Sequence, residues 1–153
     1  MKRPVWIALS TAALVAGGAF WLMVGTDAEA VSLPYEDAAS VALGEEIYQT
    51  HCAACHGARL EGEPDWRRPG ADGYMPAPPH DESGHTWHHP DDVLFAITKY
   101  GTEAVVANGY RSRMIGFDDI LSDDEILAAL AYIKSTWPPR VIATHNEINA
   151  AAR

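Results

Sequence analysis

The stretch Cys52-Ala53-Ala54-Cys55-His56 decides how this chain is interpreted. Two thiols separated by two residues can reach the two vinyl groups of one porphyrin, and a histidine directly after the second thiol is carried under the iron by the same turn of backbone. We therefore expect one covalently attached haem c, with Cys52 and Cys55 as attachment points and His56 as an axial ligand of the iron.

A Cys-x-x-Cys pair also occurs in zinc sites and in thioredoxin-like redox centres. A zinc site needs two further ligands at matching spacing, and this chain has no other cysteine. A structural disulfide leaves His56 without a role. A redox dithiol and a mixed cysteine and histidine metal site remain as alternatives to haem attachment.

The first thirty residues differ from the rest of the chain. Lys2 and Arg3 precede an uncharged segment over residues 5–25, and Ala28-Glu29-Ala30 follows, which is the order of an export signal. The segment is also long enough to span a bilayer as a helix. We expect residues 1–30 to be a transmembrane anchor or a signal peptide cleaved after Ala30. Either places the remainder on the periplasmic side of a bacterial inner membrane, anchored or soluble.

The remainder is long enough for one domain of ordinary size, and its charge narrows the choice of partners. We expect a short linker over residues 31–37, a domain over residues 38–137 and a tail over residues 138–153. The chain has a formal net charge of −10, which argues against binding to nucleic acid.

Apolar spacing predicts an all-α domain of three to four helices. One helix is expected over residues 37–50, with Gly44 allowing another helix to approach closely, and a second over residues 90–100. Six of the ten prolines fall in residues 57–90, so that stretch should be a long loop wrapped around the haem. The tail over residues 140–153 is expected to be a short helix or a frayed end.

The last helix of the domain has the clearest signals. Ser122 and Glu125 form a capping box, and Leu121 and Ile126 form a hydrophobic staple. The apolar face of this helix runs to Trp137, where two prolines stop it. We expect this face to pack on the first helix, with Tyr132 near Gly44.

A haem held by one histidine needs a sixth ligand to close its other face, and a methionine sulfur commonly supplies it. Of the four methionines, Met1 and Met23 belong to the N-terminal segment. Met114 lies in an irregular segment just before the last helix, late enough to cross the opposite haem face. Met75 is the competing candidate, although it follows His56 by only 19 residues.

These features resemble the class I c-type cytochromes over residues 38–137. The resemblance rests on the attachment motif, on Met114-Ile115-Gly116-Phe117 and on the capped helix that follows. It implies that His56 is the proximal ligand and Met114 the distal ligand. One difference is Ile115, where the family usually has proline. The family also aims a proline carbonyl at the ligand histidine, and the candidates here are Pro76, Pro78 and Pro79.

The resemblance implies a monohaem electron carrier, either free or as a cytochrome subunit of a larger oxidoreductase, and not an enzyme in itself. A quinol-oxidising complex as electron donor and a terminal oxidase or reductase as acceptor fit this family. A basic patch for an acidic partner is one hypothesis; pairing of the same arginines with Glu61, Glu63, Asp65 or haem propionates is the other. The arginines are Arg59, Arg67, Arg68, Arg111 and Arg113.

Two further functions compete with electron transfer. A haem sensor or a peroxidase-like enzyme needs a labile sixth ligand, and Ile115 leaves room for one. A metal-handling protein could use the loop over residues 80–89, which holds four of the seven histidines and includes His85, His88 and His89. The other interpretation of this loop is that Trp87 covers the haem and the histidines make local hydrogen bonds.

Overall fold

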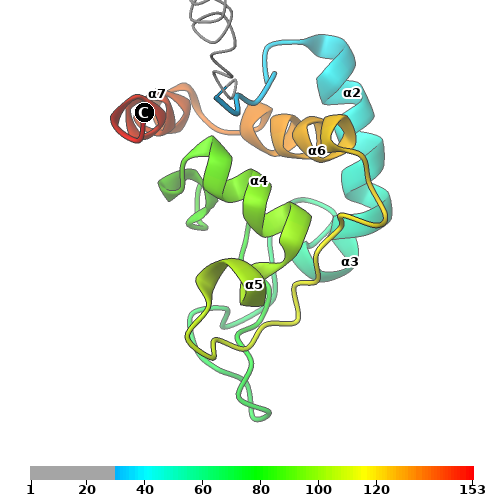
Figure 1. The fold of residues 1–153 in the computed structure, drawn as a ribbon, viewed down its shortest axis with the longest axis vertical. Coiled ribbons are helices and arrows are strands. Elements are labelled where there is room, and N and C mark those ends of the chain that lie inside the picture. Colours follow the sequence, from blue (N-terminus) through cyan, green and yellow to red (C-terminus); the bar gives the residue numbers. More distant parts are fainter. Residues whose placement is uncertain (1–29) are drawn as a thin grey trace, which may run out of the picture. The chain divides into compact units, whose positions relative to one another are not determined.

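The computed structural model describes residues 30–153, which form helices joined by long loops and contain no strand (Figure 1). The all-α fold predicted from the sequence is confirmed. The predicted signal or anchor over residues 1–30 falls almost entirely outside the described residues. Within residues 30–153, no helix is both long and apolar enough to cross a membrane.

Helix α2 (Ala38–Ile47) begins at Asp37, whose carboxylate accepts the amide hydrogen of Ser40 at 2.9 Å. The sequence predicted that this helix ends near Thr50, and this boundary is wrong. The backbone continues as a π-helical turn (Tyr48–Cys52) and then as the short helix α3 (Ala53–His56), which stops at a glycine with a φ of 82°. The attachment motif therefore lies on helical backbone, which fixes the directions of its side chains.

Helix α6 (Asp123–Ser135) crosses α2, and the predicted capping box at its start is present. Figure 1 shows the two helices side by side, with α6 between α2 and α7. At the crossing, a Cβ atom on Gly44 would lie 1.9 Å from the carbonyl oxygen of Ala128 and 2.9 Å from the Cβ of Tyr132. The predicted role of Gly44, and its position near Tyr132, are confirmed. Buried side chains of α6, such as Ile126 and Leu130, complete the core here.

Helices α4 (Asp91–Tyr100) and α5 (Thr102–Val106) meet at Gly101, whose φ is 85°. Pro90 is the N-cap of α4, so the helix begins one residue later than the predicted start at residue 90. The amides of Phe117 and Asp118 donate to carbonyls in the last turn of α4, at 3.1 and 3.0 Å. The end of α4 therefore supports the segment that carries Met114.

The tail is helical rather than frayed: α7 (Pro139–Ala151) starts at a proline in its first turn, as that residue favours. The loop over residues 57–90 contains one short 3₁₀ turn (Thr86–His88). In Figure 1, this loop and the segment before α6 lie on the same side of α4. These two loops contain Pro78 and Met114, respectively.

Four polar side chains join α4, α6 and α7 in a buried cluster. The Asp91 carboxylate accepts from the Asn149 side-chain amide at 3.0 Å, and Nε2 of His145 lies 3.5 Å from it. The Lys134 ammonium lies 3.9 Å from the same carboxylate. Asp91, Lys134 and His145 are at most 3% exposed. The cluster thus holds α7 against the domain through charge and hydrogen bonds as well as apolar packing.

His145 should make the stability of the domain depend on pH. Its pKa is lowered by burial and by the Lys134 ammonium, while the Asp91 carboxylate and the hydrogen bond to the His89 carbonyl act in the opposite direction. His145 therefore binds a proton more readily in the unfolded chain than in the folded one. The contribution of the neutral His145 to the free energy of unfolding is lost as the pH falls below about 6.5.

The effect is measurable by urea unfolding at pH 7.5 and 5.0. His145→Gln should show a smaller loss of unfolding free energy between these two pH values than the wild type does. His88→Gln, a change at an exposed position, serves as the control. An equal pH dependence in the wild type and His145→Gln would mean that the imidazole of His145 is protonated at no cost in the folded state.

Candidate haem site

His56 is held by a single hydrogen bond from its ring. The side chain is buried, and Nδ1 lies 2.8 Å from the carbonyl oxygen of Pro78, to which it donates. Of the three candidate prolines, Pro78 is therefore the one that contacts the histidine. Burial lowers the pKa of His56, although this hydrogen bond opposes the effect. The result is a neutral imidazole whose Nε2 keeps a lone pair, as a metal ligand requires.

The two cysteines are free thiols, with Cys52 half-buried and Cys55 exposed. Burial, followed by the neighbouring Cys55, raises the pKa of Cys52 to about 11. A thioredoxin-like centre needs a thiol with a lowered pKa, because the thiolate is the nucleophile. This environment argues against the redox dithiol that the motif alone left open.

The turn after His56 is fixed by hydrogen bonds to its backbone. The Tyr48 hydroxyl, on a fully buried side chain, donates to the carbonyl of Gly57 at 2.8 Å, and the amide of Gly62 donates to the carbonyl of His56 at 2.7 Å. A Cβ atom on Gly62 would lie 2.4 Å from the nitrogen of Pro79. This close approach brings the loop that contains Pro78 back to His56.

Met114 lies in an extended segment with few bonds of its own. Its amide donates to the Ser112 hydroxyl at 3.0 Å, and the Ser112 amide donates to the Glu103 carboxylate at 2.7 Å. On the other side, a Cβ atom on Gly116 would lie 2.6 Å from the carbonyl carbon of Tyr100. These contacts hold the backbone on both sides of Met114 against α4 and α5, even though Ile115 replaces the usual proline.

The two candidate methionines differ in their surroundings. The side chain of Met114 packs against the buried core that includes Leu94 and Phe117. In the described part of the chain, Met75 is not among the side chains packed on this core. The packing therefore favours Met114 over Met75 as the residue that faces the interior of the domain.

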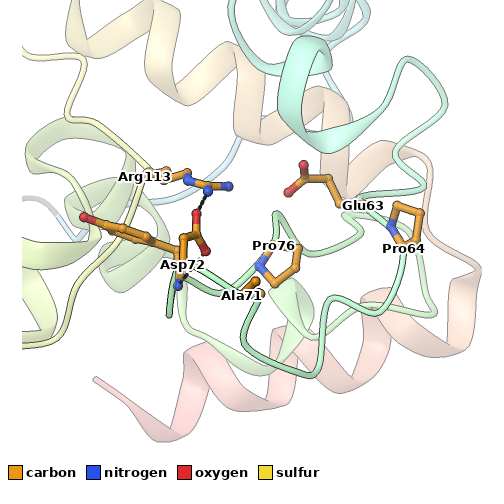
Figure 2. A pocket seen from close by; sticks show the side chains of 8 residues that line it. Glu63, Pro64, Ala71, Asp72, Pro76 and Arg113 are labelled. Carbon is orange, nitrogen blue, oxygen red and sulfur yellow. Dashed lines mark hydrogen bonds and ion pairs between the residues drawn. The ribbon is translucent and has the colours of Figure 1, made fainter.

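A cavity of about 410 Å³ lies between the loop that follows His56 and the loop that contains Met114. Figure 2 shows Arg113 and Asp72 at one end, Glu63 and Pro64 at the other, and Pro76 between them. The Glu63 carboxylate accepts a hydrogen bond from the amide of Ala77 at 2.6 Å, and Ala77 directly precedes Pro78, the partner of His56. The cavity is lined mainly by the loop over residues 63–76, with Arg113 from the other loop, and neither His56 nor Met114 is among its lining residues.

Most of the arginines of the predicted basic patch contact neighbours within the chain. Arg113 pairs with Asp72, and Arg59 lies 3.7 Å from the Glu61 carboxylate. The guanidinium groups of Arg111 and Arg67 lie 4.3 and 4.1 Å from the ring centres of Tyr74 and Trp66. Such exposed contacts contribute little to stability. The two ion pairs offset the positive charge of Arg59 and Arg113, whereas Arg67 and Arg111 keep theirs.

The histidine loop makes ring stacks. His85 stacks on Trp66 with ring centres 5.4 Å apart, and His88 stacks on Trp87 at 3.7 Å. Among residues 30–153, no group of three or more histidine, cysteine, aspartate or glutamate side chains is placed to hold a metal ion. The geometry thus offers no ready site for the metal-handling alternative.

Sequence reasoning missed one residue beside the predicted iron ligand. The ring of His80 stacks on the ring of His56, with centres 4.0 Å apart and planes inclined by 25°. In the sequence, His80 is only one of the four histidines in residues 80–89. Because His80 follows Pro78 by two residues, the contact between Pro78 and His56 also brings His80 close to His56.

Comparison with known proteins decides between the families that a Cys-x-x-Cys-His motif allows. The family model described as "Cytochrome c" matches residues 41–137. The chain belongs to the cytochrome c family. The match includes the motif, Met114 and helix α6, and it ends at Trp137, so α7 of this cytochrome lies beyond the matched range.

Among curated proteins, this cytochrome is 33% identical over 98 residues to a nitrite reductase of Stutzerimonas stutzeri. The alignment covers 60% of this chain but 15% of that relative. No solved structure gives a significant match. The chain therefore matches only a small part of that longer protein.

Family membership and the spacing of Cys52 and Cys55 together mean that this cytochrome carries one covalently attached haem c. The local chemistry fits such a group, because the structure places two free thiols and a buried imidazole with a lowered pKa within one motif. The function of the family is electron transfer.

Proposed function

We propose that Cys52 and Cys55 form the two thioether bonds to the haem, and that His56 and Met114 are its proximal and distal iron ligands. The observation that carries this proposal is the hydrogen bond from Nδ1 of His56 to Pro78. This bond keeps the proton on Nδ1 and leaves the lone pair of Nε2 free to bind iron. Met114 is the methionine that packs toward the core, and its segment follows the cavity wall formed by Arg113.

When bound, the haem supplies a one-electron couple between ferrous and ferric iron. The chain contributes ligands and surroundings. A histidine with a thioether sulfur favours the reduced iron, and a buried site strengthens this preference because it disfavours the added charge of the oxidised state. The hydrogen bond to Pro78 keeps the proton on Nδ1 and fixes the direction of the imidazole.

The protein then acts as an electron carrier, or as the cytochrome part of a larger oxidoreductase. A quinol-oxidising complex is the proposed donor. The proposed acceptor is a terminal oxidase or a reductase, and the curated relative named nitrite reductase supports a reductase. The N-terminal sequence supports a location on the periplasmic side of the membrane, with residues 5–25 as an anchor or with cleavage after Ala30.

Absorption spectra of the reduced protein with and without carbon monoxide test this proposal. A closed His56 and Met114 pair should leave the spectrum unchanged by the gas, whereas a sensor or peroxidase-like enzyme should bind it rapidly and completely. Attachment is tested separately by denaturing electrophoresis with haem staining. The wild type should keep its haem, and a Cys52→Ala, Cys55→Ala double variant should lose it. A stained double variant would show that these thiols do not hold the haem.

A further inference from the structure

His80 packs face to face against the proposed proximal ligand. Its ring lies 4.0 Å from the ring of His56 and meets the edge of the buried Tyr48 ring at 6.3 Å and 74°. Aromatic rings at these separations attract one another beyond the effect of area burial alone. One face of the His56 ring is therefore covered by a second planar ring, which restricts its rotation.

Three separate parts of the chain hold His80 in this position. Its Nδ1 lies 2.7 Å from the hydroxyl of the buried Thr86. Its backbone amide donates to the carbonyl of Leu60 at 2.8 Å, and its carbonyl accepts from Nε1 of Trp137 at 2.7 Å. The ring of His80 is thus a fixed support, anchored to the end of α6 and to the 3₁₀ turn, and independent of the bond between His56 and Pro78.

We propose that His80 is a positioning residue that sets the rotation of the His56 imidazole, and through it the electronic structure and reduction potential of the iron. The inference rests on the proposed function, since it takes His56 as the proximal ligand. The hydrogen bond to Pro78 restrains Nδ1, but a single hydrogen bond still tolerates some rotation of the ring about its Cβ–Cγ bond. The stacked ring of His80 removes that freedom.

The His80 ring acts through its shape and its dipole, because it lies against the face of the His56 ring. A polar ring beside the ligand stabilises the more highly charged ferric state better than a hydrocarbon does. Replacing it with leucine should therefore raise the reduction potential as well as free the His56 ring.

Two measurements on the haem-loaded protein test this role. The pattern of haem-methyl shifts in the NMR spectrum of the ferric protein reports the orientation of the axial ligands, and a redox titration reports the potential. His80→Leu should redistribute the methyl shifts and raise the potential. His80→Phe retains a ring that can stack and should retain the wild-type methyl pattern. His88→Leu, which removes a ring stacked on Trp87 in the same loop, should change neither quantity.

A wild-type methyl pattern in His80→Leu, with haem attached, would overturn the proposal and leave His80 as a packing residue. If His80→Leu does not accumulate with haem, Thr86→Val decides, because it removes the bond to Nδ1 and keeps the ring. A redistributed pattern in Thr86→Val supports the proposal and an unchanged one overturns it. Failure of the proposed function is seen separately, as carbon monoxide binding by the wild type or loss of the thioether attachment.

Discussion

Replacing Met114 with alanine is expected to open the iron to carbon monoxide. The alanine side chain cannot reach the metal, so the distal position becomes free or weakly bound by water. The reduced protein should then bind the gas completely, where the wild type binds none. Its reduction potential should fall by about 0.2 V, within the roughly 0.8 V over which axial ligands tune such centres. Absorption spectra and a redox titration measure the two effects.

Met75→Ala is the matched control, since it removes the other methionine of the domain. Met75 lies in the chain between Tyr74 and Pro76, which line the cavity, and in the described part of the chain it is not among the side chains packed on the core. The Met75→Ala variant should have a carbon monoxide spectrum and a reduction potential close to those of the wild type. The opposite result, an open iron in Met75→Ala and a closed one in Met114→Ala, would exchange the roles of the two residues.

The parts of this fold that local chemistry determines could be predicted from sequence. The capping box of α6 is encoded by Ser122 and Glu125, two residues that satisfy each other's backbone amides. The contact at Gly44 was predictable because a glycine inside a helix costs stability unless something must approach it. The capping box needed only two residues three positions apart, and the close approach at Gly44 needed only the position of a glycine inside a helix.

The remainder depended on contacts between distant segments. Pro76, Pro78 and Pro79 are equivalent in sequence, and only the path of the loop selects Pro78 as the partner of His56. The stacking of His80 on His56 joins residues 24 positions apart and has no local signal. The end of the first helix was misplaced because a π-helical turn inserts the motif into continuous helical backbone without a glycine or proline to mark it.

Helix α7 shows the same limit, and it also carries the prediction with the largest effect on stability. The sequence allowed a helix or a frayed end, because the residues that hold this tail lie in α4 and α6. Asp91 in α4 accepts hydrogen bonds from the amide of Leu33 at 3.2 Å and from Asn149 at 3.0 Å, and it is the nearest acid to the buried Lys134 ammonium. Burial lowers the pKa of Lys134, and Asp91 partly offsets this.

Asp91→Ala should therefore lower the free energy of unfolding by about 3–5 kcal/mol, since it leaves the Lys134 ammonium buried without its counter-charge. Asp92→Ala is the control on the same helical turn; its side chain is exposed, and the change should cost about 0.5 kcal/mol or less. Urea unfolding of the haem-loaded proteins gives both values.

A double variant separates the missing charge partner from the missing hydrogen bonds. If the unpaired ammonium is the main cost, Asp91→Leu combined with Lys134→Met should be more stable than Asp91→Ala, because a matched apolar pair replaces a lone buried charge. If the double variant is less stable than Asp91→Ala, the main cost lies in the bonds to Leu33 and Asn149. The carboxylate would then stabilise the domain by joining the N-terminal linker, α4 and α7, and the charge of Lys134 would be secondary.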